Sequence, residues 1–162
     1  GDYYRLPPAT TPQSQETHMS YPPCKRPLPY ARLDPVDSFS EALWLMLSTI
    51  DTEPIAETVL FVLDDTRCGV GVTHVDSRQP DDVVAAVDWV VATAGSTVEA
   101  AGLIVGSVRP NGGAELGDLA RWAQIAELCD EAGLELLEWI VLGSSGVTCP
   151  REVSGAPPRW RC

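Results

Sequence analysis

The sequence predicts an α/β protein in which helices cover the faces of a mixed β-sheet. Three apolar runs have the length and the β-branched content of buried strands: residues 57–63, 101–105 and 134–142. Amphipathic stretches with helical spacing separate them: residues 38–50, 80–94 and 118–132. Strands and helices in this order favour a single sheet with helices packed on it.

The first helix is predicted to begin at Ser38, because Ser38 and Glu41 have the spacing of a capping box. The apolar residues of this helix share one stripe: Phe39, Leu43, Met46, Leu47 and Ile50. Trp44 lies off that stripe. We therefore take Trp44 as a candidate contact with the N-terminal segment or with another chain.

A β-hairpin and a second helix follow. The strand over 57–63 reaches turn-forming residues at 64–67, and residues 68–75 are expected to return antiparallel to it. The helix opens at Pro80, and its valines and alanines fall within an arc of about 120°. Trp89 lies opposite this arc among small side chains, which makes it a candidate interface anchor. Alternatively, another element of the same chain covers it.

The C-terminal half is predicted to alternate strand, helix and strand. A loop rich in turn formers is expected at 109–113, before a helix that Gly133 ends. A short edge strand is expected at 147–149, and residues from Pro150 onward are expected to form a loose tail.

The domain organisation follows from composition. Residues 1–35 are rich in proline and are expected to be extended or disordered on their own, with order beginning at Ser38. The alternative is that residues 26–30 form a polyproline-type ligand or belong to an arm that folds onto the domain. We expect one domain over 36–152 and a tail over 153–162.

Charge and cysteine content exclude several classes of function. A net charge of −12 and a pI near 4.4 disfavour nucleic acid and anionic membranes as partners. No apolar run approaches the ~20 residues of a membrane span, and the N-terminus lacks a signal-peptide core, so we expect a soluble cytoplasmic protein. Five cysteines without a CxxC pair indicate reduced thiols rather than disulfides or a zinc cluster, and no cofactor is expected.

Four segments carry a resemblance to a known family: residues 58–64, 75–77, 103–112 and 136–143. Together they resemble the RadC-like branch of the JAB/MPN metallohydrolases over roughly residues 55–152. The resemblance implies a cytidine-deaminase-like architecture and a bacterial protein. In that family a strand ends in His-x-His-Pro-Ser-Gly, and an aspartate begins the next helix. The two histidines and the aspartate bind zinc, and an upstream glutamate acts on the metal-bound water.

This sequence departs from that motif at the metal ligands. Ser107 and Arg109 stand at the two histidine positions, and Asn111 stands at the serine position. The aspartate position falls on Asp118. Zinc catalysis needs three protein ligands and an open position, and a guanidinium has no lone pair to donate. The resemblance therefore implies a metal-free pseudoenzyme.

The remaining ligand position has other interpretations. Asp118 is also placed to cap its helix. Arg109 is a solvated loop residue, a basic group that attracts an anionic ligand, or a replacement for the metal charge beside Asp118. We predict that Arg109 and Asp118 pair. The family's Asp-His pair falls on Glu138 and Trp139, whereas Glu57 is one residue out of phase with the family's glutamate and is not assigned to it.

Three functions remain open. The first is a non-catalytic module, for protein interaction or regulation, with a vestigial metal site that binds a small ligand or a peptide. The second is a hydrolase in which Asp118, Glu115 or His74 holds a metal or acts as acid and base. The third is a DNA-repair-associated factor, which the acidic charge and the lack of the family's DNA-binding helical hairpin disfavour. We expect a protein partner or self-association.

Overall fold

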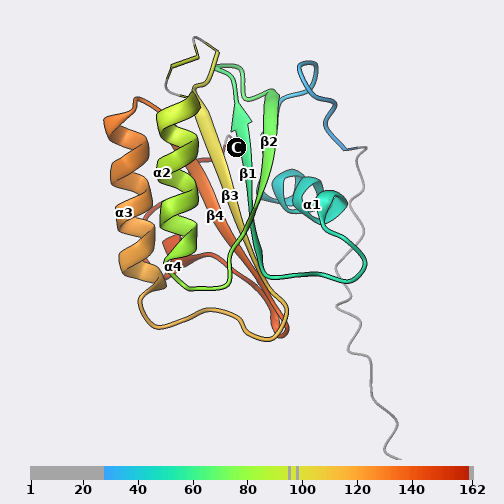
Figure 1. Ribbon diagram of the computed structural model, residues 1–162. Helices are drawn as coiled ribbons and strands as arrows, with labels where there is room; N and C mark the ends of the chain where they lie inside the picture. Colours follow the sequence, from blue (N-terminus) through green and yellow to red (C-terminus); the bar gives the residue numbers. More distant parts are fainter. Residues whose placement is uncertain (1–27, 95, 98, 161–162) are drawn as a thin grey trace, which may run out of the picture.

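The computed structural model describes residues 28–94, 96–97 and 99–160 (Figure 1). The remaining residues, which include most of the predicted N-terminal arm, lie outside this part. The elements, in chain order, are α1 (Phe39–Thr49), β1 (Glu57–Leu63), β2 (Gly69–Asp76), α2 (Asp82–Ala94), β3 (Gly102–Arg109), α3 (Asp118–Glu131), β4 (Glu135–Gly143), β5 (Gly146–Thr148) and α4 (Pro150–Ser154).

The strands of the described residues form one mixed sheet in the order β2-β1-β3-β4-β5. Strands β3 and β4 are parallel and are connected through α3, whereas the other neighbouring pairs are antiparallel. Helices α2 and α3 lie side by side on one face of the sheet, and α1 lies on the other (Figure 1). The predicted α/β class with a helix-covered mixed sheet is confirmed.

The central strands are apolar on both faces because each face carries its own core. Leu60, Val105 and Trp139 are buried beneath α2 and α3. Their strand neighbours Val59, Ile104 and Ile140 are buried beneath α1. A strand that is buried on both sides shows no polar alternation, which explains the continuous apolar runs in the sequence.

The N-cap of α1 is the predicted capping box. The backbone N–H of Glu41 donates to the Ser38 hydroxyl at 3.2 Å, and the Glu41 carboxylate accepts from the Ser38 N–H at 3.1 Å. The two bonds satisfy donors that a helix start leaves without intrahelical partners. The predicted start of this helix is confirmed.

The prediction that ordered structure begins at Ser38 is wrong, because residues before Ser38 already pack on the domain. Val36 is buried, and its N–H donates to the carbonyl of Arg67 at 3.0 Å. Pro35 forms a β-bridge with Cys68. The outer edge of the hairpin offers backbone groups without a partner strand, and the segment before α1 pairs with them.

The loose tail predicted from Pro150 onward is also wrong over the described residues. Pro150–Ser154 forms α4, and a side-chain N–H of Arg159 donates to the carbonyl of Leu136 at 3.0 Å. Trp160 packs against the core beneath α1. The segment is held by polar contacts with β4 that no local sequence pattern reveals.

None of the helices in the described part of the chain is both long and apolar enough to cross a membrane.

Candidate functional site

The residues at the predicted vestigial site meet at the C-terminal end of β3, on the face that α2 and α3 cover. Strand β3 is longer than predicted and runs to Arg109, so Ser107 and Arg109 project from the same side of it. Asp118 begins α3, and Trp139 comes from the adjacent strand β4. The sheet and one helix terminus therefore bring together residues that are more than 30 positions apart.

Arg109 and Asp118 form the predicted pair. The two guanidinium Nη atoms of Arg109 donate to the two carboxylate oxygens of Asp118 at 2.7 and 3.0 Å. Only 14% of the Arg109 side chain and 5% of the Asp118 side chain are exposed. This bidentate geometry is the strongest form of a carboxylate–guanidinium contact. The predicted proximity is confirmed, and Arg109 is not a solvated loop residue.

The helix-cap interpretation of Asp118 is wrong. Gly117, in a left-handed conformation, occupies the N-cap of α3, and the Asp118 carboxylate accepts the N–H of Glu115 at 2.7 Å in the preceding loop. A further bond comes from Arg121 at 3.1 Å, one helical turn along. Through its bonds to Arg109 and to the Glu115 N–H, the Asp118 carboxylate joins the loop before α3 to the end of β3.

The environment of Asp118 favours its charged form. Burial alone would raise the pKa of this carboxyl, but the hydrogen bonds from Arg109 and from the Glu115 N–H lower the pKa below its ordinary value of 3.8. The carboxylate therefore stays ionised beside a permanent cation. Asp118 is suited to holding a guanidinium and not to acting as a general base near neutral pH.

Sequence reasoning missed Arg121. Its guanidinium bonds Asp118 and also donates to the Asp81 carboxylate at 2.7 Å, which joins the N-terminal ends of α3 and α2. The available signal was the i,i+3 spacing of Asp118 and Arg121, which places both side chains on one helix face.

Trp139 closes the inner side of the ion pair. Its ring lies 5.9 Å from the Arg109 guanidinium carbon, and its indole N–H donates to the Ser107 hydroxyl at 2.9 Å. Ser107 and Arg109 thus both contact one buried indole. Ser107 is paired across the sheet with Thr58, whose hydroxyl lies 2.6 Å from that of Ser77. The Ser107 hydroxyl and the Trp139 indole therefore lie beside Arg109 on this face of the sheet.

A close backbone approach fixes the loop above this site. A Cβ atom at Gly143 would lie 2.5 Å from the carbonyl oxygen of Gly112 and 2.6 Å from the Cα of Gly113. Ser144 completes the contact, because its N–H and its hydroxyl both donate to Gly112. The end of β4 therefore holds the loop that follows Arg109.

The donor set does not fit a zinc ion. The Ser107 hydroxyl accepts the indole N–H, and Arg109 places a cation where a metal ion would have to lie. Both carboxylate oxygens of Asp118 accept hydrogen bonds from the Arg109 guanidinium. Within residues 28–94, 96–97 and 99–160, no group of three His, Cys, Asp or Glu side chains has a geometry that could hold a metal ion.

The residues of the alternative hydrolase site do not converge. His74 is hydrogen-bonded to Glu57 at 2.9 Å, and the sheet register places both on the face beneath α1. Asp118 lies on the opposite face. Glu57 therefore lies on the other face of the sheet from Ser107. Glu115 lies on the loop before α3 and lines a cavity of about 220 Å³ with Arg109 and the exposed Asn111.

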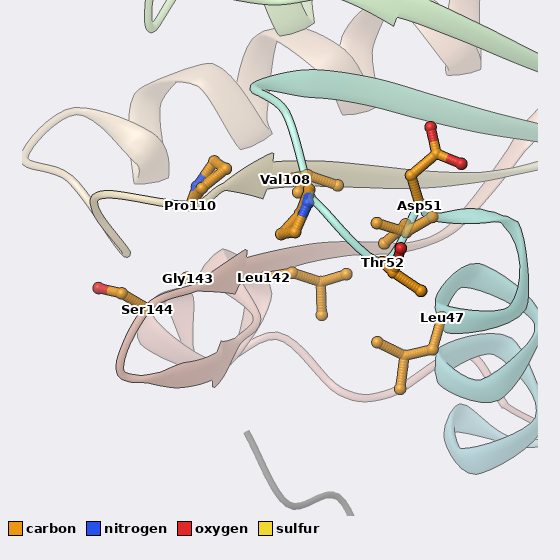
Figure 2. Close-up of a pocket in the computed structure, with 10 residues that line it drawn as sticks. Leu47, Asp51, Thr52, Val108, Pro110, Leu142, Gly143 and Ser144 are labelled. Atoms are coloured by element: carbon orange, nitrogen blue, oxygen red, sulfur yellow. The ribbon is translucent and has the colours of Figure 1, made fainter. Parts of the chain in front are cut away.

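A larger groove of about 460 Å³ lies on the α1 face (Figure 2). Leu47 comes from α1, Val108 from β3 and Leu142 from β4, and their apolar side chains point toward one another. Asp51 and Thr52 line its rim beyond α1. Sequence reasoning missed this groove because its lining residues come from three separate segments.

The two candidate interface tryptophans differ in exposure. Trp89 is 57% exposed on α2 and lines a groove of about 320 Å³ between α2 and the β1–β2 hairpin. Trp44 is half-buried on α1. The predicted exposure of Trp89 is confirmed, and its role as a contact stays a prediction.

Comparison with known proteins does not assign this chain to a family. No protein-family model matches this chain. No curated protein matches it either.

Proposed function

We propose that this chain is a non-catalytic module of the JAB/MPN type, in which protein interaction or regulation has replaced hydrolysis, and that it acts in the cytoplasm. The observation that carries the proposal is the buried Arg109–Asp118 pair. In the RadC-like motif that the sequence resembles, the Arg109 position supplies a zinc ligand. Here a guanidinium fills that position and uses both oxygens of the one carboxylate that the motif retains.

Two further observations support the proposal. The Ser107 hydroxyl, at the other histidine position, accepts the indole N–H of Trp139 and so belongs to the packed interior. Cys68, Cys129 and Cys149 are free thiols, which suits a reducing compartment. A hydrolase with an altered site is less well supported, because Asp118 is fully engaged and His74 lies on the other face of the sheet.

The test is zinc binding by the full chain and by a variant with the family's ligands restored. We expect the unaltered protein to retain far less than one zinc per chain after dialysis, measured by elemental analysis. The variant Ser107→His/Arg109→His is expected to gain zinc affinity, because it returns two imidazoles beside Asp118. Adding Asp118→Asn to this variant is the control and should reduce the gain.

Stoichiometric zinc in the unaltered protein would overturn the proposal and would support the alternative function, a hydrolase with an altered metal site. Failure of the histidine variant to bind zinc would instead show that Asp118 does not hold the family's ligand position.

If the module acts in protein interaction, Trp89→Ala is expected to weaken self-association or the capture of a partner. A half-exposed indole beside a groove contributes contact area without supporting the core, so the thermal midpoint should change by less than about 3 °C. Sedimentation velocity and affinity capture measure the association. Leu116→Ala, at a fully exposed apolar residue elsewhere, is the matched control. A large drop in the thermal midpoint with unchanged association would show that Trp89 stabilises the fold and is not an interface residue.

A further inference from the structure

One edge of the sheet carries a small apolar groove. Strand β2 is the outermost strand on this side, and the groove of about 230 Å³ lies between it and α1. Leu45 of α1, Phe61 of β1 and Val72 of β2 line it together with Val36. This volume is below the ~300 Å³ at which small-molecule pockets begin, and it suits one or two side chains of a peptide.

The segment before α1 already follows this edge. The N–H of Arg32 donates to the Gly69 carbonyl at 3.1 Å, next to the Pro35–Cys68 bridge. Farther toward the N-terminus, Pro29 and Tyr30 line the groove itself. The chain therefore enters the described structure beside the groove and alongside β2.

Apolar side chains at this place are unusually open to solvent. Tyr30 is 70% exposed, and Val72, in the middle of the edge strand, is 50% exposed. Glycines at 69 and 71 leave the strand surface open, since a Cβ atom at either would meet no atom within 4 Å. An edge strand with an apolar residue at its centre is a template for another extended segment.

The sequence immediately upstream has suitable chemistry. Residues 20–27 read Ser-Tyr-Pro-Pro-Cys-Lys-Arg-Pro. Proline-rich segments are pre-organised in an extended form and dock on aromatic-lined grooves, and proline in a sheet is tolerated at an edge. Residues 1–27 carry a net charge of +1, so the remainder of the chain carries −13, and Asp34 lines the groove. Charge thus favours the approach of Lys25 and Arg26.

We propose that residues 20–27 of this chain dock in the groove between α1 and β2 and extend the contact that residues 28–36 begin. The reach is sufficient, since the four residues from Cys24 to Leu28 span about 13 Å when extended. The docked segment covers Val72 and closes the free edge of the sheet. Any partner that adds a strand to β2 then has to displace this segment.

The native Cys24 provides the test in the full chain. In a Cys162→Ser background, Val72→Cys places a thiol in the groove. The matched control is Leu33→Cys, because Leu33 is 77% exposed, is closer to Cys24 in sequence and does not line the groove. Disulfide formation under mild oxidation is followed by non-reducing peptide mapping. Cys24→Ser confirms the assignment of each bridge.

A docked segment is expected to bridge to position 72 about tenfold faster than to position 33, because docking raises the local concentration of Cys24 at the groove. An undocked segment would favour position 33, since the intervening loop is short. Equal rates, a faster bridge to position 33, or no bridge to position 72 would overturn the proposal. Disulfide-linked dimers through position 72 would also overturn it and would assign the groove to a second copy.

Discussion

Replacing Arg109 with methionine is expected to lower the free energy of unfolding by about 3 kcal/mol. The substitution leaves the Asp118 carboxylate buried without its bidentate partner, and breaking a buried ion pair from one side costs about 3–5 kcal/mol. The bonds from Arg121 and from the Glu115 N–H remain, so we expect the lower end of that range. Urea unfolding at neutral pH measures the loss.

A double-mutant cycle shows whether the loss comes from the pair. Arg109→Met combined with Asp118→Asn should cost less than the two single changes together, because no buried charge is then left alone. Arg32→Met is the control: its ion pair with Glu99 is about two-thirds exposed on both sides and should be worth less than about 1 kcal/mol. Strict additivity of the two changes at the site would contradict the proposed coupling.

Replacing Arg151 with methionine is expected to cost about 3–5 kcal/mol at neutral pH. Arg151 donates from Nε to the Glu138 carboxylate at 2.9 Å, and the Glu138 side chain is fully buried. Its other oxygen has no hydrogen-bond partner among the described residues. Without Arg151, the buried Glu138 carboxylate loses its cation, and taking up a proton then lowers the cost of burying it.

This loss should depend on pH in a defined direction. Burial raises the pKa of Glu138 above its ordinary value of 4.5 even though the hydrogen bond from Arg151 lowers it. Removing Arg151 removes the opposing effect and raises the folded-state pKa further. Between the unfolded and folded pKa values the folded state binds more protons, so the stability of the variant falls as the pH rises through that window.

Urea unfolding at about pH 5 and about pH 8 is the measurement, and the variant should be relatively more stable at the lower pH. Glu138→Gln in the Arg151→Met background removes the titrating carboxyl and should therefore abolish this pH dependence of stability. An equal loss at both pH values would show that Glu138 does not carry the effect.

Local patterns in the sequence were enough to predict the class of the fold. Strands in a sheet that is covered on both faces must be apolar throughout, and helices that pack on it must carry an apolar stripe. Both patterns can be recognised within a short window of sequence. Ser38 and Glu41 determined the start of α1 for the same reason, since the two partners of a capping box are three residues apart. The pairing of Arg109 with Asp118 was also predictable, because one short loop separates them.

By contrast, the surroundings of that pair and the packing of residues 150–160 depend on tertiary contacts. The indole of Trp139 reaches Ser107 across 32 positions of sequence, and the parallel register of β3 and β4 creates that contact. Arg151 is buried in α4, and its guanidinium pairs with Glu138, a charged residue between apolar residues of β4. Both contacts depend on strand order and register, which are global properties of the sheet, and no window of local sequence encodes them.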